Sequence, residues 1–83
     1  NKREQKNIGC FKLSKRMPNG IMYFISLNKK YKNLVLLVRD IFKDCDSFHE
    51  YETDNSIEFG IRYTDIEEKE LMKRLQKVNG TKY

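Results

Sequence analysis

The fold is decided by the stretch CFKLSKRMPNGIMYFISL, residues 10–27. In its first part apolar residues such as Phe11 and Leu13 alternate with polar ones, the pattern of a strand with one solvent-exposed face. The segment Pro18-Asn19-Gly20 predicts a tight hairpin turn, because proline presets φ and glycine accepts a positive φ. The return segment, residues 21–27, is apolar on both faces, which favours a central strand.

A helix is expected next, at about residues 29–44. Apolar residues recur there in steps of three and four from Tyr31 to Cys45, and this spacing places them on one helical stripe. Leu36 and Leu37 widen the stripe. We therefore expect this helix to be heavily buried.

The second half of the chain repeats this plan. One strand is expected at 47–53, a turn at Asp54-Asn55, and a second strand at 56–63 with a regular apolar row on one parity. A final helix is expected after Asp65, which has Glu68 three residues later in the spacing of a capping box. Asn79-Gly80 is a typical stop signal for that helix.

The element order is therefore ββαββα, and the predicted fold class is α+β. We expect one four-stranded antiparallel sheet with both helices packed on one face, since only one parity of each strand is consistently apolar. This order is a circular permutation of the ferredoxin-like βαββαβ order. The domain is expected to span residues 9–80, with a polar N-terminal tail at 1–8 and a short C-terminal tail at 81–83.

Length and charge narrow the class of protein. A chain of 83 residues allows one domain, and it holds no apolar run long enough to span a membrane. The formal net charge is +5, and it is uneven: residues 1–33 carry nine basic groups and one acidic group. Such polarity indicates a positive surface that suits a polyanion, although lysine-rich small proteins also use lysine simply for solubility. Because no Met opens the chain, we expect a fragment or a processed product.

The reactive side chains are few. Cys10 and Cys45 are too few for a disulfide framework, so we expect small buried thiols and an intracellular, reducing compartment such as the cytoplasm or nucleus. Cys45 and His49 have metal-ligand spacing but no second ligand pair, so no metal or cofactor is expected. Phosphate-binding loops and nucleophile motifs are absent from the sequence, and no catalytic residue is proposed.

The uncovered face of the predicted sheet is the best candidate for function. Strand alternation places basic and aromatic residues on it together, the combination that neutralises phosphates and stacks bases. We predict a nonenzymatic module that binds DNA or RNA. Its expected contacts are Lys12, Arg16 and Arg62 to phosphates, Phe24 and Tyr51 to bases, and Lys29 and Lys30 as further basic contacts. The alternative is a protein-interaction or dimerisation domain that uses the same face.

A family resemblance adds to this interpretation. Gly9-Cys10-Phe11, followed by a basic strand, a hairpin, a helix, a second hairpin and a helix, resembles one half of a LAGLIDADG-type homing endonuclease. The resemblance implies a sheet that lies on DNA. The signature helix of that family is missing, and Ile8 stands where the family has its metal-binding acid. A degenerate nuclease half is therefore a third interpretation, after binding without cleavage and protein interaction.

Overall fold

The computed structural model describes residues 4–16 and 22–81, which form a five-stranded antiparallel sheet with helices on one side. The spatial order of the strands is β1-β2-β3-β5-β4. The elements in chain order are β1 (Glu4–Ile8), β2 (Phe11–Arg16), β3 (Met22–Asn28), the 3-10 helix η1 (Lys29–Leu34), α1 (Val35–Ile41), β4 (His49–Glu52), β5 (Ser56–Arg62) and α2 (Glu68–Asn79). The expected turn at Pro18–Gly20 lies outside the described residues.

The α+β class and the antiparallel sheet are confirmed, but the predicted count of four strands is wrong. The predicted ββαββα order, a permuted ferredoxin-like topology, is wrong as well, because three strands precede the first helix. Residues 4–8, expected to belong to a polar tail, form the edge strand β1, which pairs with β2 from Glu4–Lys15 to Ile8–Phe11. Ile8 is only 5% exposed and anchors this strand in the core. The short β1–β2 turn is possible because Gly9 adopts a φ of 60°, a conformation that favours glycine.

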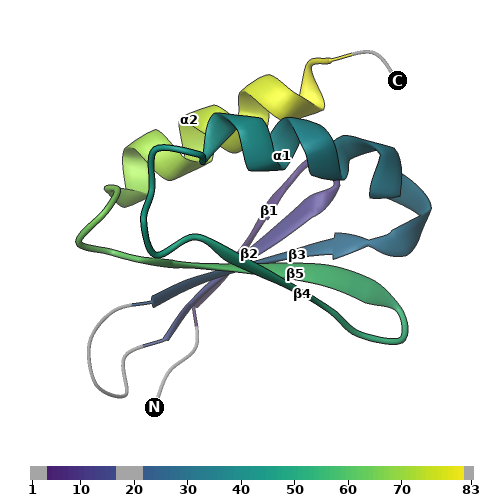
Figure 1. Cartoon of the computed structure of the whole chain (residues 1–83), viewed down its shortest axis with the longest axis horizontal. Coiled ribbons are helices and arrows are strands. Elements are labelled where there is room, and N and C mark those ends of the chain that lie inside the picture. The colour runs from purple at the N-terminus through teal and green to yellow at the C-terminus, as the bar shows by residue number, and fades with distance from the viewer. Residues whose placement is uncertain (1–3, 17–21, 82–83) are drawn as a thin grey trace.

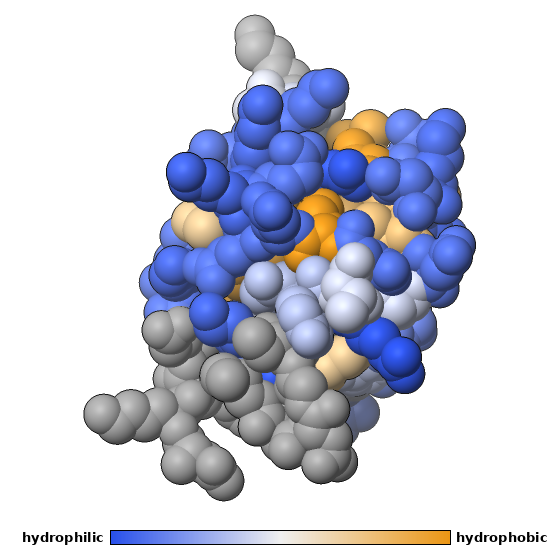
Figure 2. Space-filling model, turned by 90° about the vertical axis from the view of Figure 1, so that its left-hand side faces the viewer, coloured by the Kyte–Doolittle hydropathy of each residue, from blue (hydrophilic) through white to orange (hydrophobic). Residues whose placement is uncertain are grey.

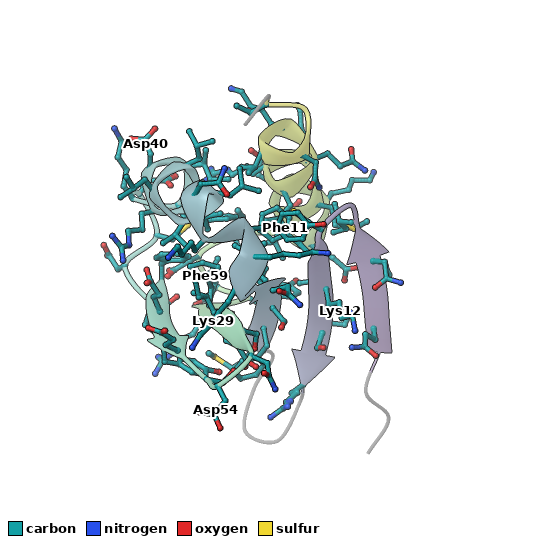
Figure 3. All side chains as sticks on the ribbon, turned by 90° about the vertical axis from the view of Figure 1, so that its right-hand side faces the viewer. Phe11, Lys12, Lys29, Asp40, Asp54 and Phe59 are labelled. Atoms are coloured by element: carbon teal, nitrogen blue, oxygen red, sulfur yellow. The ribbon has the colours of Figure 1, made fainter. Side chains whose placement is uncertain are left out.

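Helices α1 and α2 both pack on one face of the sheet, as expected (Figure 1). Phe11 and Phe59 point into the layer between helices and sheet and are fully buried (Figure 3). Phe59 stacks on Phe48, with ring centroids 5.5 Å apart, and Phe48 stacks in turn on Phe42 at 5.4 Å. This aromatic column joins β5 to the residues that follow α1.

The single helix expected at 29–44 is instead the 3-10 helix η1 followed by the short α1. Tyr31 has non-helical angles inside η1. The expected burial of Leu36 and Leu37 is also wrong, since they are 70% and 37% exposed. Val35 and Val38 of α1 face the sheet, and an α-helix that turns these two positions inward leaves the residues between them pointing away.

Helix α2 begins at Glu68, later than the predicted capping box implies, and Asp65 does not cap it. The Asp65 carboxylate accepts hydrogen bonds from the Ser47 hydroxyl and from the Ser47 backbone N–H, the latter at 2.8 Å. These two bonds lower the pKa of Asp65. Asp65 therefore ties the β5–α2 loop to the segment that leads into β4.

The C-terminal end of α2 is fastened to the β1–β2 turn by Asn79. Its amide Nδ2 donates to the Ile8 carbonyl at 2.7 Å. Its Oδ1 accepts from the Cys10 backbone N–H at 3.2 Å and from the Cys10 thiol at 3.1 Å. This arrangement joins the first and last elements, so that β1 belongs to the folded domain.

Figure 2 views the molecule from one end, where hydrophobic residues show as small areas between hydrophilic ones. This surface agrees with a core that lies between the helices and the sheet. Within residues 4–16 and 22–81, no helix is long and apolar enough to cross a membrane.

Candidate nucleic-acid interface

The face of the sheet opposite the helices is covered by no other element of the described chain (Figure 1). Directly paired residues of antiparallel strands share a face, so the register defines what this open face presents. Three of its cross-strand rows are Asn7-Lys12-Ser26-Glu58-Tyr51, Gln5-Ser14-Phe24-Gly60-His49 and Arg16-Met22-Arg62, and the pair Asn28-Ser56 has the same parity. We call these residues the open face.

Five of the seven predicted binding residues lie on the open face: Lys12, Arg16, Phe24, Tyr51 and Arg62. They come from four different strands and up to 50 positions apart in the chain. The sheet register therefore brings together basic and aromatic residues that the sequence separates.

Lys29 and Lys30 do not join this group. The Lys29 ammonium lies 3.0 Å from a carboxylate oxygen of Glu52, a residue on the parity that faces the helices. The Lys30 ammonium lies 5.1 Å from the centre of the Tyr31 ring in η1. Both lysines therefore belong to the start of η1 rather than to the open face.

The described strands place three cations and one carboxylate on the open face, namely Lys12, Arg16, Arg62 and Glu58. The acidic residues of β4 have the opposite parity. Glu50 is among them, and both of its oxygens accept from Arg39, at 2.6 and 2.8 Å. The hydrogen bond from Arg39 lowers the pKa of Glu50. The acids of β4 thus lie off the open face, whereas Asp46 and Asp65 line a hollow together with Arg62.

The first ring stack of the open face is formed by His49 and Tyr51. Their ring centroids are 5.8 Å apart and the planes differ by 19°. The His49 ring lies over the backbone of β5 at Gly60: a Cβ built on Gly60 would stand 2.5 Å from His49 Cε1. A hydrogen bond between His49 Nδ1 and the Ser47 carbonyl, at 3.0 Å, holds the ring there. Glycine at position 60 therefore makes room for a ring laid across the sheet.

The second stack consists of Arg16 and Phe24. The Arg16 guanidinium lies 4.8 Å from the centre of the Phe24 ring, which is half-buried. Such a pair is a cation–π contact, and the planar guanidinium is itself a surface on which a base can stack. Phe24 and His49 flank Gly60 on either side, so the two stacks are roughly 10 Å apart, two interstrand spacings.

Tyr51 remains a neutral phenol at physiological pH. Its pKa is raised chiefly by desolvation and secondly by Glu58, its direct cross-strand partner. The ring is 41% exposed. Tyr51 can therefore offer an aromatic surface to a polyanion without adding negative charge.

A shallow hollow of about 460 Å³ adjoins the first stack. Its lining includes Met22, His49 and Arg62 from the open face, together with Ser47 and Asp65 from the adjoining loops. The hollow combines a ring, a guanidinium and the two carboxylates of Asp46 and Asp65. These groups can stack on a base, neutralise a phosphate and accept a hydrogen bond from an amino group, respectively.

His49 and Gly60 are not among the residues that the sequence predicts to bind nucleic acid. Two signals could have found them: His49 and Tyr51 are two residues apart in one strand and so share a face, and a glycine inside a strand indicates a close approach. Cys45 is buried in the core. The Cys45–His49 spacing therefore does not create a shared site, because His49 lies on the other side of the sheet.

Comparisons of this chain with protein-family models, with curated proteins and with solved structures found no match. The geometry and charge of the open face therefore carry the functional proposal.

Proposed function

We propose that this domain is a nonenzymatic nucleic-acid-binding module and that the open face is its binding surface. The observation that supports this proposal most strongly is that one uncovered face of the sheet carries three cations and three aromatic rings. Two of the rings form the His49–Tyr51 stack, and the third, Phe24, lies under the guanidinium of Arg16, one of the three cations. Lys12, Arg16 and Arg62 neutralise phosphates, and the ring stacks contact bases.

The two other interpretations have less support. A dimer interface on this face would use Phe24 as an apolar contact. It would then also bury the Arg16 guanidinium, which lies over the Phe24 ring. Burying a charge without a partner is costly. A nuclease half would need an acid before Gly9, and that position is Ile8, a core residue that is 5% exposed. Nucleic-acid binding without cleavage needs neither a buried Arg16 nor an acid at position 8.

The proposal is tested by fluorescence anisotropy with labelled DNA and RNA oligonucleotides across a salt series. Each phosphate contact should contribute a slope of about −0.7 to −0.9 in log affinity against log salt. The double variant Lys12→Gln/Arg16→Gln should therefore bind more weakly, with a slope that is shallower by roughly two contacts. Both side chains are exposed, so the fold should persist.

A matched control removes the same charge from the other side of the molecule. Lys73 and Lys77 are exposed on α2, so the double variant Lys73→Gln/Lys77→Gln has the same net charge as the open-face variant. Under the proposal the control retains nearly the wild-type slope. Equal losses in both double variants would show that net charge alone drives binding, and would refute the open face as the site.

A further inference from the structure

We propose that the ligand of the open face is specifically a single-stranded nucleic acid, held by stacking of unpaired bases on the two ring stacks. This inference rests on the proposed function and goes further, because it names the structural class of the ligand. It would exclude duplex DNA or RNA as the preferred ligand.

Single-stranded and duplex nucleic acids present different groups to a protein surface. A duplex presents phosphates and base edges on its surface, while the faces of its bases are stacked on one another. The faces become available only in a single strand, where they stack on aromatic rings and on arginine guanidinium planes. A surface of rings laid across a sheet is therefore of use mainly to unpaired bases.

The orientation of His49 is the observation that favours stacking. The ring lies in the space that a Cβ of residue 60 would occupy, against the backbone of β5, and it is nearly parallel to Tyr51. His49 is nevertheless exposed. One side of the ring thus packs on the sheet, and the exposed surface of the His49–Tyr51 pair is what a ligand can reach. Side chains that read base edges instead extend away from the protein into a groove.

The position of the cations agrees with a single strand as well. Arg16 lies over Phe24 in the second stack, and Arg62 lies beside His49 in the lining of the hollow. Each stack thus has its own guanidinium, so one cation stands beside each base-stacking position. This alternation suits a flexible backbone that follows the sheet, with its bases turned down onto the rings.

The hollow beside His49 gives a single strand a second way to bind. It is open, and Arg62 stands in its wall together with the carboxylates of Asp46 and Asp65. An unstacked base can enter it, whereas a base within a duplex is retained by its partner and its neighbours. The open face and the hollow therefore form a continuous surface for unpaired nucleotides.

Gly60 provides a specific test of this arrangement. The three atoms nearest to a Cβ at position 60 all belong to the His49 ring, the outer end of a side chain that can rotate away. Gly60→Ala should therefore displace His49 while β5 remains intact, since alanine costs less backbone entropy in a strand than glycine. The positive charge of the open face does not change in this variant.

The experiment measures the affinity of the full chain for three probes by fluorescence anisotropy across a salt series, and the probes are compared at one of these salt concentrations. The probes are a mixed-sequence DNA strand of about 12 nucleotides, its duplex, and an abasic strand of the same length, a size within the range that single-strand-binding domains cover. The variants are Tyr51→Ala, Gly60→Ala and the conservative control Tyr51→Phe, each checked for folding by circular dichroism.

We expect the wild type to bind the single strand at least tenfold more tightly than the duplex or the abasic strand. Tyr51→Ala should lose about 5- to 150-fold in affinity for the single strand, the equivalent of one base stack, with the salt slope unchanged. Gly60→Ala should lose affinity for the single strand only, while Tyr51→Phe retains it.

Two results would overturn the inference in distinguishable ways. If the duplex or the abasic strand binds as tightly as the single strand, base stacking is refuted, although the proposed function stands. If none of the three probes binds, the proposed function fails together with the inference.

Discussion

The contacts of Asn79 lead to a specific prediction about stability. Replacing Asn79 by alanine removes the hydrogen bond to the Ile8 carbonyl, at 2.7 Å, and the bond from the Cys10 backbone N–H, at 3.2 Å. The Cys10 thiol loses its acceptor in the same variant. Both ends of the β1–β2 turn thus lose the side chain that ties them to α2.

The expected loss follows from these contacts. A hydrogen bond is worth about 1 kcal/mol net, and a partly buried group left without a partner costs about 1–3 kcal/mol. The higher helix propensity of alanine offsets at most roughly 0.7 kcal/mol. We therefore expect Asn79→Ala to lower the free energy of unfolding by about 1–3 kcal/mol, a substantial part of the total of a domain of this size.

The assay is urea unfolding followed by circular dichroism, with Gln76→Ala as the matched control. Gln76 also carries an amide and lies on the same helix, but its side chain is exposed. The control should change stability by less than about 0.5 kcal/mol. If Asn79→Ala is no less stable than Gln76→Ala, the amide does not hold β1 and α2 together, and our account of this contact is wrong.

Two further predictions concern the core and the response to acid. Phe59 is fully buried, so Phe59→Ala should cost about 3–5 kcal/mol, and an unchanged melting temperature would contradict the assigned strand parity. Hydrogen bonds from Lys6 and Lys15 lower the pKa of Glu68 in the folded protein. The resulting stabilisation is present above the unfolded pKa of about 4.3 and is lost as the pH falls through the lower folded value. Glu68→Gln should weaken this acid dependence in melts from pH 7 to pH 2, and an unaltered pH profile would argue against these ion pairs.

The parity of the inner strands could be predicted because burial imposes it. Phe11, Ile25 and Phe59 each stand in an alternating segment, and all three are fully buried as that alternation indicates. One face of each strand meets the helices, so a shift by one residue would expose the whole apolar row. This is the part of the fold for which local pattern and tertiary packing agree.

Strand β1 could not be predicted in this way. An edge strand has one neighbour and little burial, so residues 5–7 show no apolar alternation, and Ile8 is the one core residue of β1. Its pairing with β2 depends on the turn at Gly9 and on Asn79, about 70 residues away. Such long-range contacts leave no periodic signal in the segment itself.

In the candidate site, too, some features follow from local sequence pattern and others depend on contacts between distant segments. Strand alternation predicts that Lys12, Arg16 and Phe24 share one face, because alternation depends on local geometry alone. The stacking of His49 over Gly60 requires the register between β4 and β5, which pairs these two residues directly. Register is a property of the assembled sheet, so the ring stack could not be derived from either strand alone.

The central claim, that the open face binds nucleic acid, is tested most directly by titration of the ¹⁵N-labelled protein with a single-stranded oligonucleotide. We expect the largest amide shift changes at Phe24, Gly60 and Tyr51, and little change at Lys73 and Lys77 on α2. Changes that gather on the helical side while the amides of the open face stay unshifted would contradict the account.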